Sequence, residues 1–195
     1  QTVEKTKVPA NRRVIGNRWV LVKKDDGRFW AITVAKGYNQ IPGKDFQENH
    51  APVVNDTTFH LVLAWKVMYK LMAGQFDIET ACLYGDLDEE IWMEFLEGYD
   101  DYLEETHKSI KDPRTYCVKL NQALYGLGQA ARQWWKKFKE IMLSLNFQPS
   151  EADSCQFIKK IPKDEIISFL ILYVDDGGII GTQERIDELV SGISE

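Results

Sequence analysis

The sequence is poor in cysteine, with three widely separated residues, Cys82, Cys117 and Cys155, among 195. None forms a C-x-x-C pair, which argues against a zinc site or a disulfide framework and favours buried, reduced thiols. Long apolar runs are also missing, since the longest, Ile166–Val174, is interrupted by Ser168 and is too short to span a bilayer. No signal-peptide pattern opens the chain. We therefore expect an intracellular protein with no membrane insertion, without distinguishing a cytoplasmic, nuclear or organellar location.

Positive charge is not in excess either. Lys and Arg number 24 against 30 Asp and Glu, so the formal net charge is -6. Proteins that bind nucleic acid usually present a basic face to the phosphates. The charges are unevenly spread, however, because acidic residues gather at 86–105 and basic ones at 5–44 and 132–139. This distribution allows a local basic track, and the 44% hydrophobic content is enough for a packed core.

Local patterns predict a mixed α+β fold. Strand-like segments at Arg18–Val22 and Phe29–Val34 flank an Asp-Asp-Gly turn, which is typical of a β-hairpin. Apolar residues at intervals of three and four predict helices at Thr58–Leu71 and Ala130–Leu145. Residues 1–13 are expected to be loosely ordered, and 100–112 to be a polar surface excursion. The other predicted elements are strands at Gln75–Ile78, Ile91–Phe95, Tyr116–Leu120, Phe157–Lys160 and Ile166–Val174, and a helix starting at Glu184–Val190.

Each of the two long helices is expected to bury one side. In the first, the predicted buried positions are Leu61, Ala64, Trp65, Met68 and Leu71. In the second, they are Trp134, Trp135, Phe138 and Met142. The second helix also mixes aromatic with basic residues, so a platform on which nucleic-acid bases stack is the alternative interpretation.

Two adjacent carboxylates, Asp175 and Asp176, follow the last apolar strand and precede two glycines. Asp-Asp-Gly-Gly is also ordinary turn chemistry, so this segment alone does not define a site. Neighbouring carboxylates repel each other, however, and a bound cation relieves that repulsion. Hard oxygen ligands of this kind suit Mg²⁺.

A further carboxylate, Asp77, lies between the apolar residues Phe76 and Ile78, so it points to the opposite face of a strand. In isolation this is equally the pattern of a solvent-facing residue on an edge strand. Glu79 would share the face of Asp77 if the strand continued, although a surface charge or a helix N-terminal residue explains it as well.

Taken together, these segments resemble the reverse transcriptase domain of copia-type retrotransposons. The similarity covers roughly residues 12–190, with the segments in the order that the family has them. The matching segments are Ile15-Gly-Asn-Arg-Trp-Val20, Val34-Ala-Lys-Gly-Tyr-Asn-Gln40, Ala51-Pro-Val-Val54, Phe76-Asp-Ile-Glu-Thr-Ala81, Gly85-Asp-Leu87, Leu124-Tyr-Gly-Leu127, Gln129-Ala130 and Tyr173-Val-Asp-Asp176.

The resemblance implies a right-hand polymerase fold with fingers at about 14–55, a palm at about 56–195 and no thumb. The palm would be an antiparallel sheet packed on helices. By the family pattern, Asp77, Asp175 and Asp176 would bind two Mg²⁺ ions for nucleotidyl transfer. The partners of an active chain would be dNTP and an RNA or DNA template-primer.

The sequence departs from the family at positions that face the substrate. Trp30 and Ile32 stand where the family pattern has cations that clamp the incoming triphosphate. Cys82 stands where the pattern has an aromatic residue that excludes ribonucleotides. The candidate substrate-binding residues that remain are Arg28, Lys36, Cys82 and Gln129.

Three interpretations therefore stay open. The first is a working reverse transcriptase module. The second is a domesticated, catalytically weak or inactive subunit of the same fold, which scaffolds a protein or ribonucleoprotein complex and binds protein partners. The third is an inert fragment of a transposon polyprotein. The carboxylates favour the first, whereas the acidic balance and the missing clamp cations favour the second.

Overall fold

The computed structural model describes residues 1–99, 112–160 and 168–194, and its fold is α+β as predicted. The chain forms two compact units, each made of two segments: Gln1–His50 with Cys82–Trp134, and Ala51–Ala81 with Trp135–Glu195. The sequence predicted one continuous palm over 56–195, whereas residues 82–134 pack with the N-terminal segment. The assignment of fingers and palm stays a prediction. No helix in the described residues is long and apolar enough to cross a membrane.

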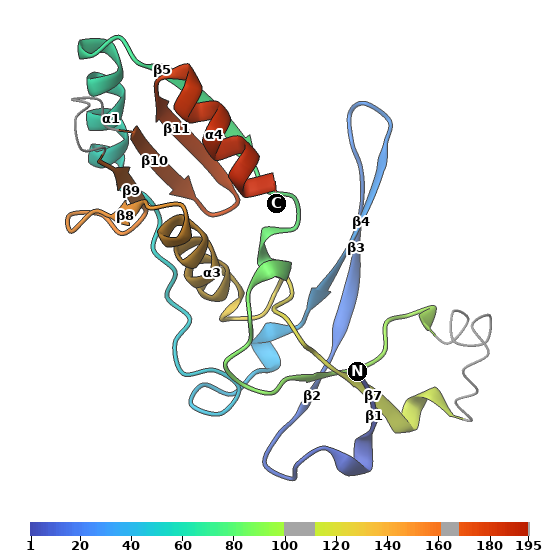
Figure 1. Cartoon of the computed structure of the whole chain (residues 1–195). Coiled ribbons are helices and arrows are strands. Elements are labelled where there is room, and N and C mark those ends of the chain that lie inside the picture. The colour runs from blue at the N-terminus through green and yellow to red at the C-terminus, as the bar shows by residue number, and fades with distance from the viewer. Residues whose placement is uncertain (100–111, 161–167, 195) are drawn as a thin grey trace. The chain divides into compact units, whose positions relative to one another are not determined.

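The first unit contains a long antiparallel ribbon and a small sheet. Among the described strands, β3 (Asn17–Lys23) and β4 (Phe29–Ala35) pair only with each other and form the ribbon, which extends from the rest of its unit (Figure 1). The small sheet has the order β1-β7-β6-β2. Its strands are β1 (Thr2–Glu4), β7 (Tyr116–Lys119), β6 (Trp92–Met93) and β2 (Val14–Ile15). Strand β6 is therefore much shorter than the strand predicted over Ile91–Phe95.

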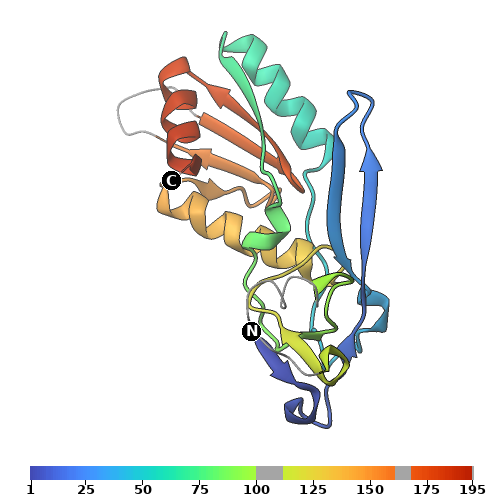
Figure 2. The same cartoon turned by 90° about the vertical axis from the view of Figure 1, so that its right-hand side faces the viewer.

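The second unit is a five-stranded antiparallel sheet between helices. The strand order is β5-β11-β10-β9-β8, with α1 on one face and α3 and α4 on the other (Figure 2). The strands are β5 (Met72–Asp77), β11 (Asp176–Gly181), β10 (Ser168–Tyr173), β9 (Gln156–Lys159) and β8 (Gln148–Pro149). The helices are α1 (Asp56–Met68), α3 (Ala130–Ser144) and α4 (Gln183–Ser194).

Aromatic contacts hold helices to both faces of this sheet. On one face, Phe138 of α3 packs against Phe76 of β5 at 6.3 Å and against Phe157 of β9 at 5.6 Å between ring centroids. On the other face, Trp65 of α1 lies 4.6 Å from Phe169 of β10. The predicted burial of Phe138 is thus confirmed, and both faces of the central strand are covered.

Helix α1 buries only part of the side predicted, since Trp65 and Leu71 pack on the core while other predicted positions do not. The side chain of Asn55 accepts a hydrogen bond from the backbone of Thr57, which caps the helix and starts it two residues earlier than expected. Val62 is the fully buried residue, whereas the predicted core residues Leu61 and Met68 are 46% and 70% exposed. Apolar residues surround this helix on all sides, so their spacing does not identify the face that packs on the sheet.

The prediction that residues 1–13 are loosely ordered is wrong, because Thr2–Glu4 forms β1 and pairs with β7. Other predictions agree with the structure or lie outside the described residues. Helix α3 occupies nearly the predicted range, and the three cysteines are buried without forming a disulfide. The predicted polar excursion at 100–112 lies, apart from Asp112, outside the described residues, as do the first two residues of the strand predicted at Ile166–Val174.

Candidate active site

The β10–β11 hairpin carries two of the three predicted metal ligands. Tyr173 and Asp176 are paired residues, so the loop between them consists of Val174 and Asp175 alone. Val174 has a φ of 56°. A positive φ at the first loop position occurs in the tight hairpin turns where glycine or asparagine is usual, and a β-branched residue there is strained. The tip is therefore held by the pairing of its strands rather than by the preference of its residues.

Strand β5 brings the third carboxylate to the same corner. Asp77 and Asp176 are directly opposed on neighbouring antiparallel strands, so their side chains leave the same face of the sheet. The backbone N–H of Ile78 donates to the carbonyl of Asp175 at 3.1 Å, which continues the pairing into the turn. Asp77 and Asp176 are exposed and Asp175 is half-buried.

Three carboxylates at one corner have the chemistry for a divalent ion, because Mg²⁺ prefers oxygen ligands. Opposed like charges on a sheet also repel each other, and a cation would relieve this. Within the described parts of the chain, however, no group of three or more His, Cys, Asp or Glu side chains converges as a metal-binding cluster. The strand pairing thus gathers the three backbone positions, while the metal-ligand role of their side chains stays a prediction.

A close contact between an aromatic ring and a glycine fixes the register of the two carboxylate strands. Phe76 is opposed to Gly177, each next to one of the predicted ligands. A Cβ at position 177 would lie only 2.0 Å from Cζ of Phe76. The ring therefore occupies the space of the missing side chain, and it packs in turn on Phe138. Only a residue without Cβ lets the two strands pair in this way.

Two of the predicted substrate-binding residues lie in or beside the ribbon of the first unit. Arg28 donates from Nε to Oδ2 of Asp26 at 2.8 Å, and its Nη2 lies 2.7 Å from the same oxygen. The hydrogen bond from Arg28 lowers the pKa of Asp26, so the pair is an ion pair at neutral pH. Lys36 follows β4 and is half-buried. A triphosphate would have to compete with Asp26 for the guanidinium of Arg28.

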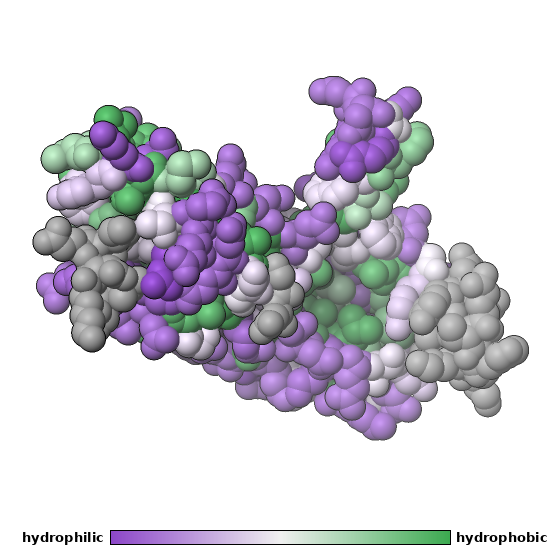
Figure 3. All heavy atoms as spheres, turned by 45° about the horizontal axis from the view of Figure 1, so that its top comes forward, coloured by the Kyte–Doolittle hydropathy of each residue, from purple (hydrophilic) through white to green (hydrophobic). Residues whose placement is uncertain are grey.

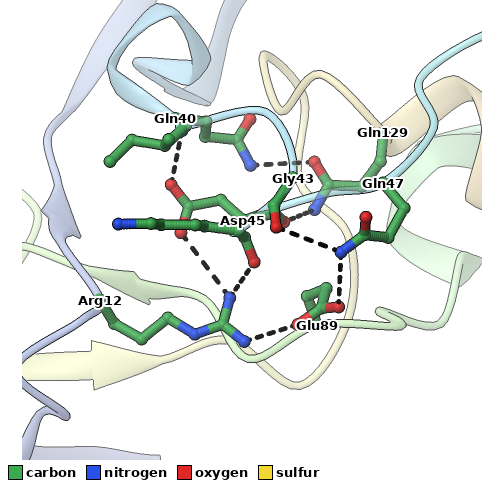
Figure 4. Close-up of polar contacts among 9 residues, drawn as sticks. Arg12, Gln40, Gly43, Asp45, Gln47, Glu89 and Gln129 are labelled. Carbon is green, nitrogen blue, oxygen red and sulfur yellow. Dashed lines mark hydrogen bonds and ion pairs between the residues drawn. The ribbon is translucent and has the colours of Figure 1, made fainter.

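Gln129 belongs to a buried polar network in the same unit (Figure 4). It is 2% exposed. Its Oε1 accepts from Nε2 of Gln40 at 2.9 Å, and its Nε2 donates to the backbone carbonyl of Asp45 at 3.1 Å. Both ends of the amide are thus used within the protein, and the predicted role of Gln129 in substrate binding stays a prediction. Cys82, at 5% exposed, lies in the apolar core beside Ile15 and Ile91.

The same network contains three charged residues, Arg12, Asp45 and Glu89, beside its glutamines. Arg12 reaches between Asp45 and Glu89 in Figure 4, with Nη2 2.6 Å from Oε2 of Glu89 and Nη1 3.8 Å from Oδ1 of Asp45. The hydrogen bond from Arg12, followed by one from Gln47, lowers the pKa of Glu89. No local pattern in the sequence marks these residues, because the partners lie dozens of positions apart.

Comparison with known proteins gives consistent matches. The family model described as reverse transcriptase (RNA-dependent DNA polymerase) matches residues 1–191. The chain is 35% identical, over 98% of its length, to the retrovirus-related Pol polyprotein from transposon TNT 1-94 of Nicotiana tabacum. It is 35% and 34% identical, over 89% of its length, to those from transposons RE1 and RE2 of Arabidopsis thaliana. The chain spans 11–14% of the length of these relatives. No solved structure matches.

Proposed function

Because the chain belongs to the reverse transcriptase (RNA-dependent DNA polymerase) family of copia-type Pol polyproteins, we propose that it is a template-directed DNA polymerase module. Its substrates would be dNTP and a primer paired to an RNA or DNA template. The second unit would be the palm, and the β3–β4 ribbon would belong to the fingers. Asp77, Asp175 and Asp176 would be the residues that hold the metal ions.

The observation that carries this proposal is the pairing at the corner of the second unit. Asp77 and Asp176 are opposed on adjacent strands, and Asp175 lies in the turn that joins β11 to β10. Divalent ions held there would activate the attacking 3′-hydroxyl and stabilise the leaving pyrophosphate. The contribution of the chain is to fix three oxygen-bearing side chains on a rigid pair of strands, with Phe76 and Gly177 setting their register.

A second candidate is a repurposed subunit with weak or no catalysis. It is favoured by the ribbon, where Trp30 and Ile32 leave the same face and replace the cations expected from the family pattern. The guanidinium of Arg28 forms an ion pair with Asp26, so it is a poor replacement for the missing cations. In this case the chain would keep the fold and contribute it to a larger assembly.

Primer extension decides between the two candidates. The polymerase proposal expects Mg²⁺-dependent incorporation of dNTP that is lost in Asp77→Asn and in Asp175→Asn. Asp187→Asn is the matched control, since Asp187 is exposed on α4, where it accepts a hydrogen bond from Gln183. Incorporation that survives in Asp77→Asn would overturn the assigned site. No incorporation by the wild type, and no rise in Tm with Mg²⁺ and dNTP, would leave the second candidate, because ligand binding must raise stability.

A further inference from the structure

The second unit contains a cavity that the proposed function does not use. It has a volume of about 810 Å³ and lies beside the C-terminal end of α1, and every described residue that lines it belongs to this unit. Cavities of ~300–1,000 Å³ are the size that encloses small organic molecules. Two of the lining residues, Met72 and Gly181, are paired on β5 and β11. The pair of Asp77 and Asp176 lies five residues further along these strands, or about 17 Å, so the cavity is separate from the carboxylate corner.

The wall of this cavity is largely apolar. Phe169 is buried and contacts Trp65, with 4.6 Å between the ring centroids, whereas Tyr69 and Met72 are more than half exposed. Figure 3 shows hydrophobic residues at the surface of the second unit near α1. The apolar lining residues are Trp65, Tyr69, Leu71, Met72, Ile158 and Phe169. A wall of this kind suits an apolar chain or ring, because it gains from contact with apolar groups and offers them no competing charge.

The end of α1 places a lysine at this apolar wall. The backbone N–H of Leu71 donates to the carbonyl of Lys66 at 2.9 Å, and that of Lys70 donates to the carbonyl of Val67 at 3.3 Å. This pair of hydrogen bonds is a Schellman motif, in which glycine usually occupies the position with a positive φ. Here Lys70 occupies it, with a φ of 53°. A position where glycine would be less strained thus carries a long cationic side chain that lines the cavity.

The polar residues of the lining supply positive charge and, among the described residues, no negative charge. Lys160 is the second cation, and Thr182 and Gln183 are neutral. No carboxylate in the described ranges forms an ion pair with Lys70 or Lys160, whereas the neighbouring Lys159 pairs with Glu188 at 3.1 Å. Two cations beside an apolar wall favour a ligand that is apolar over most of its length and anionic at one end.

We infer that this cavity binds an amphipathic carboxylate of the fatty-acid class. The apolar chain of the ligand lies against Trp65, Leu71 and Phe169, and its carboxylate meets Lys70 and Lys160. Burial of the chain supplies most of the affinity, at roughly 4-fold for each methylene group removed from water. The inference goes beyond the proposed function, because the ligand is neither a nucleotide nor a nucleic acid and its site is remote from the carboxylate corner.

Titration of the chain with 11-(dansylamino)undecanoate, whose emission rises in an apolar environment, tests the inference. We expect a saturable signal from one molecule per chain. Decanoate should displace the probe up to roughly 16-fold more effectively than octanoate, which has two methylene groups fewer. Decanoate should also displace it more effectively than 1-decanol, which has a chain of the same length without the charge.

Substitution of the two lysines tests where the carboxylate binds. Lys70→Asn and Lys160→Gln should each weaken binding of the probe about 2- to 5-fold, which is the value of an exposed ion pair. Asn tolerates the positive φ at position 70, so the helix cap is kept. Lys66→Gln is the matched control, since it removes the same charge from α1 at a residue that does not line the cavity. It should bind the probe as the wild type does.

The outcomes separate this inference from the polymerase proposal. Asp77→Asn should bind the probe as tightly as the wild type, because the cavity and not the carboxylate corner is measured. A signal that does not saturate would overturn the inference, and so would equal displacement by decanoate and 1-decanol. Binding by Lys70→Asn and Lys160→Gln that equals binding by Lys66→Gln would overturn it as well. Primer extension has no part in these measurements, so its failure would leave the inference standing. Circular dichroism of each variant verifies that the fold is retained.

Discussion

We expect Gly177→Ala to destabilise the second unit, because the ring of Phe76 lies where the new methyl group would be. That methyl carbon would lie 2.0 Å from Cζ and 2.4 Å from Cε2 of the ring, far inside the ~3.5–4.0 Å at which carbon atoms pack. The ring cannot simply move aside. It stacks on Phe138, which is fully buried and packs on Phe157.

The magnitude follows from the size of the overlap. Overpacking a well-filled core costs about 1–3 kcal/mol. The ring of Phe76 would have to move by more than an ångström against a buried neighbour, so we expect a cost of about 3 kcal/mol. For a chain of this size, that corresponds to a fall in Tm of about 6–12 °C. Thermal and urea unfolding, monitored by circular dichroism, measures it.

The neighbouring glycine provides the control. A Cβ at position 178 would lie 3.3 Å from Cγ1 of Ile171, which is tight but much less so. Gly178→Ala should therefore cost under about 1 kcal/mol. Adding Phe76→Leu to Gly177→Ala should recover part of the loss, since the smaller side chain leaves room for the methyl group. If Gly177→Ala unfolds at the same temperature as Gly178→Ala, the steric argument is wrong.

Three further predictions concern the first unit and the thiol of Cys155. Gln129→Ala should lower the free energy of unfolding by about 1–3 kcal/mol in urea, because it removes the hydrogen bonds of Gln129 to Nε2 of Gln40 and to the backbone carbonyl of Asp45. Arg12 lowers the pKa of Glu89, so the ion pair stabilises the fold above the unfolded pKa of ~4.3 and this contribution is lost as the pH falls through the folded pKa. Between about pH 5 and 3, the Tm of Arg12→Ala should accordingly fall less than the Tm of the wild type. An equal fall in both proteins would contradict this. Burial raises the pKa of Cys155 to about 12, so in the folded protein at pH 8 this thiol should resist alkylation, measured by peptide mass spectrometry, until urea unfolds the chain.

Sequence patterns predicted the elements well where one side of an element is apolar and the other polar. Helix α3 is an example, because Trp134, Phe138 and Met142 recur on one apolar side, so its buried Phe138 could be named in advance. Helix α1 is the opposite case. Apolar residues surround it, so the buried Val62 and the exposed Met68 look alike in the sequence.

The carboxylate corner was predictable from the family pattern and not from local chemistry. Asp77 and Asp176 are separated by almost a hundred residues, and only the strand order places β5 beside β11. The contacts of Arg12 and Gln129 were not predictable, because they depend on long-range packing of loops that have no periodicity. The same packing engages both ends of the Gln129 amide within the first unit, and the substrate-binding role that its matching segment suggested stays a prediction.

The positive φ of Val174 makes handedness, rather than size or polarity, the property that limits which residues the hairpin tip accepts. The backbone there has the sign that a D-amino acid adopts without strain, whereas the L-residue Val174, unlike the achiral glycine, is strained in it and is held there by the pairing of β10 with β11. Glycine would fit with less strain but would also free the tip to move. The strained L-residue therefore keeps the tip fixed by strand pairing, while the relaxed alternative, glycine, loosens the turn that carries Asp175.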